Sequence, residues 1–170
     1  HKDILPKFIN IKEYPHLPKG LSSAPFDHEG VATQEKNIIT DGVLSTYLLS
    51  SYSARRLGLQ TTGNAGGAHN CTLTPGTMDQ AQLIKQMHTG LIVTELLGSG
   101  VNLVTGDYSQ GAAGFWVENG SLQYPVEEIT IAGNLRDMYA NLVAVGNDLD
   151  HRYSVITGSV LLEAMTIAGN

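Results

Sequence analysis

The 170-residue sequence contains a single cysteine, Cys71, so an internal disulfide bond is excluded. One lone thiol suits a reducing compartment, and we expect a cytoplasmic location. Basic residues are also scarce, because ten Lys and Arg stand against sixteen Asp and Glu and only Arg55 and Arg56 are adjacent. A nucleic-acid surface needs clustered basic side chains for phosphate contacts. We therefore expect no direct nucleic-acid partner.

Long apolar runs are missing as well. No stretch approaches the roughly 20 apolar residues of a membrane span, and the opening "HKDILPKFIN" lacks the apolar core of a signal peptide. We expect no membrane partner. The composition, with 42% hydrophobic and 15% charged residues, is that of a folded globular protein. This length suits one domain with a real core, so we expect a single domain over residues 1–170.

Complete metal and phosphate motifs are absent. His28 and Glu29 begin a pattern like the zinc helix HExxH, but Ala32 and Thr33 stand where HExxH or HExxxH would place the second histidine. The glycine-rich stretch "GSGVNL" lacks the third glycine of a dinucleotide fingerprint, and no Lys-Ser or Lys-Thr pair follows a glycine loop. We expect no cofactor and no metal in this chain.

Nucleophile motifs are also incomplete. "GDYSQG" resembles the G-x-S-x-G elbow, but Gly106 lies three residues before Ser109 instead of two. Cys71 has only His69 as a nearby ligand type, which gives two metal ligands at most, and we interpret it as a small packing residue. We therefore assign no catalytic residue to this chain.

Turn and cap signals are what the sequence does supply. Asp-Gly at 41–42 and Asn-Gly at 119–120 each lie between β-prone runs and predict tight hairpins. The first would pair Thr40 with Val43 and Ile39 with Leu44; the second would pair Val117 with Leu122 and Phe115 with Tyr124, giving one strongly apolar face. Further strands are expected at 7–14, 91–97, 127–133, 152–157 and 160–169.

Three short helices are expected between these strands. Ser50 or Ser51 would cap the first, which Gly58 would end; Thr77 would cap the second, and Asn134 would cap a third over 135–145. Strands and helices do not alternate regularly, and no repeat is present. The sequence therefore predicts an α+β fold, a mainly antiparallel β-rich domain with a few short helices.

Glycine-rich loops interrupt this pattern, notably "GNAGGAHN" and "GDYSQGAAGFW". Glycine in such places serves either tight turns and bulges or the close backbone approach of a partner chain. Together with the apolar hairpin face, the loops would suit a scaffold that holds an extended peptide by strand addition.

Three stretches carry a specific resemblance: "YSARRLGLQTTGNAGGAHN", "GDYSQGAAGFWVENGSLQYPVEEITIAGNL" and "VGNDL". They resemble the C-terminal domain of the TldD/PmbA family, in its PmbA (TldE) branch, and the resemblance covers essentially the whole chain. It implies that this is the C-terminal domain of a two-domain α+β protein whose N-terminal domain is not in this chain.

The resemblance implies an intracellular metallopeptidase assembly of TldD-like and PmbA-like subunits that acts on unfolded peptides in their maturation and degradation. In the TldD-like subunit, zinc is held by an HExxxH helix and by a cysteine just before a glycine. The corresponding stretch here has Thr157 before Gly158. A threonine hydroxyl is a poor substitute for a thiolate at zinc. Zinc is therefore expected in the TldD-like partner.

For peptide contacts, the resemblance and the glycine loops favour the backbone around Ser109, Gly111 and Gly114 first, and Gly66, Gly67 and His69 second. A different reading stays open, in which the domain is a stand-alone protein-interaction module without peptidase activity, reflected in the old family label "modulator of DNA gyrase". An HExxxH motif upstream would instead make the protein a peptidase in its own right.

Overall fold

The computed structural model describes residues 3–169, which form two compact units. Unit 1 comprises His1–Pro75 and Asp148–Gly158, and unit 2 comprises Gly76–Asn147 and Ser159–Asn170. The chain passes from one unit to the other three times. The expectation that the two units behave as one domain stays a prediction.

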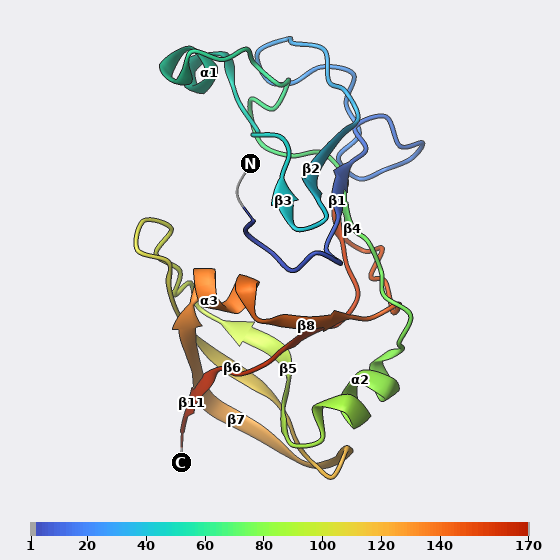
Figure 1. Ribbon diagram of the computed structural model, residues 1–170, viewed down its shortest axis with the longest axis vertical. Coiled ribbons are helices and arrows are strands. Elements are labelled where there is room, and N and C mark those ends of the chain that lie inside the picture. Colours follow the sequence, from blue (N-terminus) through green and yellow to red (C-terminus); the bar gives the residue numbers. More distant parts are fainter. Residues whose placement is uncertain (1–2, 170) are drawn as a thin grey trace. The chain divides into compact units, whose positions relative to one another are not determined.

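Unit 1 is built on a five-stranded sheet in the order β3-β2-β1-β4-β9. Figure 1 labels β1 to β4 of this sheet. Its strands are β1 (Ile11–Glu13), β2 (Lys36–Thr40), β3 (Val43–Leu44), β4 (Cys71–Leu73) and β9 (Val155–Ile156). All neighbours are antiparallel except β4 and β9, which run parallel. The single helix described in this unit is α1 (Ser51–Leu57).

Local signals account for the β2–β3 hairpin and for α1. Asp41 and Gly42 both adopt positive φ, as a two-residue hairpin turn requires, and both predicted strand pairs are confirmed. Ser50 caps α1 by accepting from the Ser53 amide, and Gly58 ends it in the left-handed conformation at φ 66°, also as predicted.

The first strand is shorter than the predicted 7–14. Only Ile11–Glu13 has partners on both sides, in β2 and β4. Before it, the Ile9 amide bonds to the Pro6 carbonyl within a turn, so that segment does not enter the ladder. The predicted strand 152–157 is likewise reduced to Val155–Ile156.

Unit 2 holds a four-stranded antiparallel sheet in the order β11-β7-β6-β5 and a two-stranded ribbon, β10-β8. The strands are β5 (Gly90–Leu97), β6 (Asp107–Glu118), β7 (Ser121–Asn134), β8 (Leu142–Val145), β10 (Val160–Leu162) and β11 (Thr166–Ala168); the helices are α2 (Gln80–Met87) and α3 (Leu135–Ala140). Buried Ala112, Ile129 and Ile131 form its core cluster, against which partly buried Leu91 and Met165 pack. The predicted α+β, mainly antiparallel fold is confirmed.

The β6–β7 hairpin turns at Asn119 and Gly120, both at positive φ, as predicted. Val117 pairs with Leu122 as expected, but Phe115 pairs with Pro125 and not with Tyr124. The reason is a register shift between Phe115 and Val117, because a bulge offsets every pair beyond it. Of the predicted apolar face, only Val117 is buried; Leu122 and Tyr124 are each 53% exposed.

One of the two helix starts in unit 2 differs from the prediction. Asp79, not Thr77, caps α2, and its capping box is completed by Gln82. Asn134 caps α3 as expected.

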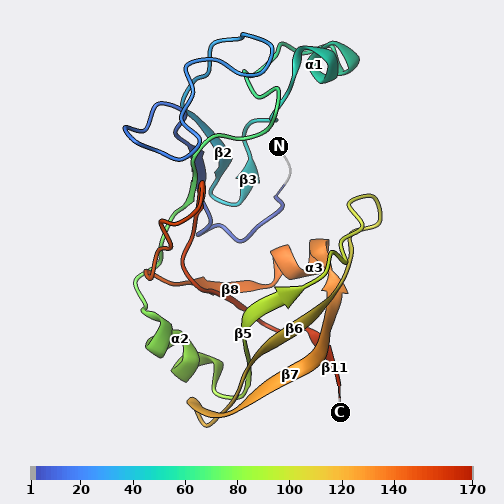
Figure 2. The ribbon, with the colours of Figure 1, turned by 180° about the vertical axis from the view of Figure 1, so that it is seen from behind.

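The predicted helix 135–145 ends at Ala140, because Leu142–Val145 forms β8 and pairs with β10. Figure 2 shows β8 running on from α3. The last predicted strand, 160–169, is divided into β10 and β11, which pair with different strands. Within residues 3–169, no helix has the length and apolar character that crossing a membrane requires.

Candidate functional site

The interior of unit 1 contains an ionisable side chain, Glu13, at the end of β1. Alternation along the strand turns Lys12 to the surface and Glu13 inward, where its residue is 0% exposed. A buried carboxylate is costly unless it is paired and hydrogen-bonded. The surrounding loops meet this requirement.

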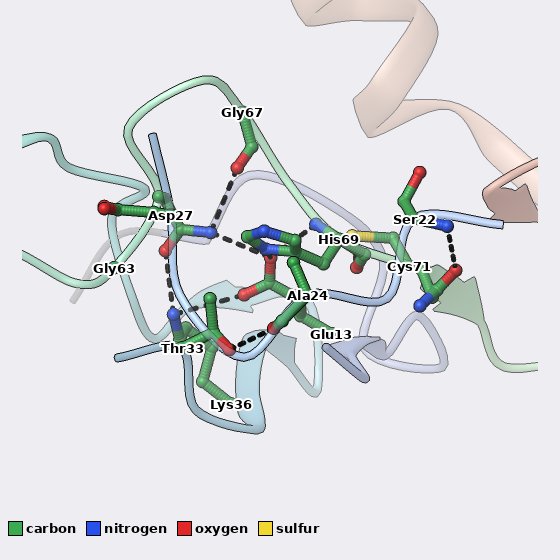
Figure 3. Close-up of polar contacts among 12 residues, drawn as sticks. Glu13, Ser22, Ala24, Asp27, Thr33, Lys36, Gly63, Gly67, His69 and Cys71 are labelled. Atoms are coloured by element: carbon green, nitrogen blue, oxygen red, sulfur yellow. Dashed lines mark hydrogen bonds and ion pairs between the residues drawn. The ribbon is translucent and has the colours of Figure 1, made fainter. Parts of the chain in front are cut away.

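Three donors converge on Glu13 Oε1 (Figure 3): the His69 backbone amide at 2.6 Å, Asn64 Nδ2 at 2.8 Å and the His69 ring Nδ1 at 3.1 Å. The second oxygen, Oε2, lies 3.2 Å from Lys36 Nζ as an ion pair, although the angles do not make this contact a hydrogen bond. The glycine-rich loop 63–70 is therefore fastened to β1 through one carboxylate.

Lys36, from β2, joins the same network from the other side. Its ammonium donates to Asn64 Oδ1 at 2.7 Å and to the Thr62 carbonyl, and its side chain is only 12% exposed. Asn64 also accepts from the Thr62 hydroxyl at 2.8 Å. One buried amide thus connects the carboxylate and the ammonium, and the formal charges of Glu13 and Lys36 cancel.

A second buried carboxylate, Asp27, ties the neighbouring loop to this region. It accepts hydrogen bonds from the backbone amides of Glu29, Val31 and Ala65, at 2.9, 3.0 and 2.9 Å. Burial alone would raise the pKa of Asp27, but the three amide donors outweigh it and the pKa lies below its ordinary value of 3.8. The ionised form therefore holds the loop in place.

These loops line a partly open cavity of about 280 Å³, whose wall includes Ser22, Phe26, His28, Gly66, Gly67 and His69. Gly66 has φ 99°, and a Cβ atom there would stand 2.3 Å from His28 Nδ1. Glycine is thus required at this position both by the backbone conformation and by the close approach of the His28 ring.

The predicted peptide-contacting residues fall into two groups. Gly66, Gly67 and His69 meet at the cavity of unit 1.

Ser109, Gly111 and Gly114 lie along β6 in unit 2, where close approach occurs within the sheet itself. A Cβ on Gly114 would stand 1.8 Å from the Ile92 carbonyl oxygen. Peptide binding by either group stays a prediction.

The sequence did not predict which residues hold the loops around the cavity together. These residues are Glu13, Asp27, Lys36 and Asn64. Two signals were present. In "KFINIKEY", Glu13 falls two residues after Ile11, on the same side of the strand. The run "DHEG" places Asp27 where its side chain can accept from amides two and four residues later, as the structure shows.

Cys71 begins β4 beside this network. Burial, and then the nearby Glu13 carboxylate, raise the pKa of its thiol to about 11 against the opposing influence of Lys36. The Sγ atom lies 3.6 Å from the His69 carbonyl oxygen, to which it donates. A protonated, buried thiol agrees with the interpretation of Cys71 as a packing residue.

A zinc ion does not fit the side chains that the structure describes. Thr157, at the position where the resemblance implies a cysteine in TldD-like subunits, donates its hydroxyl to the Gly158 carbonyl at 3.0 Å. Within residues 3–169, no three His, Cys, Asp or Glu side chains are placed to hold a metal ion.

Comparison with known proteins shows which family this chain belongs to. The profile of the family described as PmbA/TldA metallopeptidase C-terminal domain matches residues 1–169. The chain belongs to the PmbA/TldD family.

Metalloprotease PmbA of Escherichia coli O157:H7 is 60% identical over 168 residues, which cover 99% of this chain and 37% of that protein. The PmbA homolog of Haemophilus influenzae is 55% identical over 170 residues, covering 99% and 38%. The resemblance to the PmbA branch is confirmed.

Solved structures share the PmbA/TldD fold of this chain. A candidate modulator of DNA gyrase from Thermotoga maritima superposes with a TM-score of 0.88 at 42% identity, over 98% of this chain and 40% of that one. A similarly named protein from Bacteroides thetaiotaomicron gives a TM-score of 0.91 at 34% identity, over 99% and 38%. TldE from Thermococcus kodakarensis, at 23% identity and a TM-score of 0.81 over 99% and 41%, supports the fold alone.

Proposed function

We propose that this chain is the C-terminal domain of a PmbA/TldE-like subunit that assembles with a TldD-like partner into a cytoplasmic metalloprotease. In that assembly it contributes to the proteolysis and maturation of unfolded peptides as the structural partner that holds no metal. The family match over residues 1–169 carries this proposal. The chain spans 37% and 38% of the length of the two curated relatives named above, so the activity of the whole protein belongs to the proposal.

The proposal that the TldD-like partner, and not this chain, binds zinc rests on the chemistry of two side chains. Thr157 offers a hydroxyl already engaged with a backbone carbonyl, and Cys71 offers a buried thiol with a pKa of about 11. Zinc prefers thiolate, imidazole or carboxylate ligands, and a thiol must lose its proton to bind it. Zinc and the chemical step therefore belong to the TldD-like partner.

The cavity of unit 1 supports a peptide-facing role for Gly66, Gly67 and His69, because these three residues line the same partly open space. Ser109, Gly111 and Gly114 are proposed to shape the peptide chamber through the β6 backbone. No residue of this chain is assigned a bond-breaking role.

The test is a cleavage assay on an unfolded peptide with three samples: the whole protein, the TldD-like partner, and the two co-purified. Zinc content is measured in each. We expect a stable complex and cleavage by the zinc-loaded complex, with no zinc and no cleavage for the whole protein alone. Zinc binding and cleavage by that protein alone would contradict the proposal.

A second candidate is a stand-alone interaction module linked to DNA gyrase modulation, without peptidase activity. The names of the Thermotoga and Bacteroides proteins favour it. Because the chain carries a net charge of −6, such a module would dock on protein rather than on DNA. Failure to form the complex, together with direct binding to gyrase subunits in a pull-down, would favour this candidate.

A further inference from the structure

The hydrogen bonds of Glu13 fix the tautomer of His69. A carboxylate can only accept, and its Oε1 already accepts from the His69 amide and from Asn64. His69 Nδ1, 3.1 Å from the same oxygen, must therefore carry the ring proton and donate it. In the neutral ring, Nε2 then presents a lone pair.

That lone pair is directed away from the carboxylate, on the far side of the ring. Among the described residues, the hydrogen bond of the His69 ring is made by Nδ1, and the side chain is only 12% exposed. His69 lines the 280 Å³ cavity. An oriented acceptor therefore borders a partly open cavity large enough for a small chemical group.

The charges around the cavity favour a positively charged occupant. Glu13 and Asp27 stand behind its wall, and Lys36, which pairs with Glu13, offsets only one of them. Phe26 is among the residues that line the pocket. A cation gains from the net negative charge of these groups, whereas a carboxylate would be repelled by it.

We propose that this cavity binds the protonated α-amino terminus of a peptide, with the ammonium donating a hydrogen bond to His69 Nε2 and with Glu13 acting as the positioning residue that holds the ring. The inference deepens the peptide-facing role proposed above and rests on it. It concerns recognition of one end of the chain, not cleavage.

The experiment uses the whole protein and two probes, the amide Ala-Ala-Ala-NH2 with a free amino terminus and its N-acetyl form. Affinity is measured by calorimetry, and the His69 ring nitrogens are followed by ¹⁵N NMR at pH 7. We expect the free-amine peptide to bind and to shift the Nε2 resonance. Acetylation should weaken binding about ten- to a hundred-fold, as for loss of a charge-assisted hydrogen bond.

The variant His69→Gln should lose affinity for the free-amine peptide by a similar factor, and the matched control His151→Gln, at an exposed position, should not. Should His69→Gln fail to fold, Ser22→Leu fills the cavity without touching the Glu13 contacts and should abolish binding equally. Equal binding of both probes, or binding without an Nε2 shift, overturns the inference. Because no cleavage is measured, binding here combined with failure of the partner complex would refute only the assembly.

Discussion

At the scale of single residues, the loop arrangement of unit 1 depends on a buried ion pair between Glu13 and Lys36. Glu13 is fully buried, and Lys36 supplies the compensating charge at 3.2 Å. Removing one member of such a pair is far more damaging than replacing both, because the remaining charge stays buried without compensation. The pair therefore serves more to specify the arrangement of the loops than to add net stability.

We expect Lys36→Met to lower the free energy of unfolding by about 3–5 kcal/mol. Adding Glu13→Gln should restore most of the loss, because the amide is neutral. Urea titration followed by circular dichroism measures both. Lys12→Met is the matched control, since Lys12 pairs with Glu35 at the surface of the same sheet and should change little. If Lys36→Met lowers the free energy of unfolding no more than Lys12→Met does, Lys36 does not compensate the buried charge of Glu13.

The residues of the candidate site were only half predictable. Gly66, Gly67 and His69 stood out because glycine clusters and histidines are visible in any sequence. Glu13 and Lys36 did not, because a charged residue in a short strand is usually exposed, and their partners lie 51 and 28 residues away in Asn64. Whether a charged side chain can be buried depends on such distant hydrogen-bonding partners, and the local sequence pattern does not reveal them.

At the scale of secondary-structure elements, most signals contained within a few residues predicted the structure, although the cap of α2 is Asp79 and not Thr77. Both hairpin turns and the caps of α1 and α3 follow from Gly, Asn, Asp or Ser at fixed offsets. The end of the third predicted helix was wrong because a remote strand determines it. The segment 142–145 continues a helical pattern in sequence but gains a ladder with β10, and this pairing overrides its local preference.

The centre of the β5–β6 pair allows a direct test of close packing. A Cβ on Gly114 would stand 1.8 Å from the Ile92 carbonyl oxygen, which backbone atoms cannot relieve without moving the strand. We expect Gly114→Ala to destabilise the protein by about 1–3 kcal/mol in thermal or urea unfolding.

Gly133→Ala, on the adjacent strand β7, is the matched control. Its Cβ would meet Met138 atoms no closer than 3.4 Å, an ordinary contact. Equal stability of the two variants would show that the β5–β6 contact is looser than described.

At the scale of the whole molecule, the two units differ in which partners their backbone N–H groups bind. Unit 2 contains strands of 8, 12 and 14 residues, whereas the longest strand among the described residues of unit 1 has 5. Unit 1 relies instead on side chains that bind loop amides, as Glu13 and Asp27 do. Long ladders open less readily than short ones with exposed neighbours.

Hydrogen–deuterium exchange should therefore find the slowest amides of the protein in β6 and β7. In unit 1, the Ala65 and His69 amides should exchange slowly for their loop, because each donates to a buried carboxylate. Uniform fast exchange across residues 63–70 would contradict this. Glu13→Gln should speed exchange at His69 and leave Ala65 less affected.

The parallel pairing of β9 with β4 has a consequence for synthesis on the ribosome. Cys71 aligns with Val155, and Thr72 with Ile156, so the last strand of the unit 1 sheet is translated only after most of unit 2. Such pairings of high sequence separation form late and slowly. The nascent chain must therefore carry an unpaired edge at β4 while unit 2 emerges, which makes that interval its most vulnerable to aggregation and to chaperone capture.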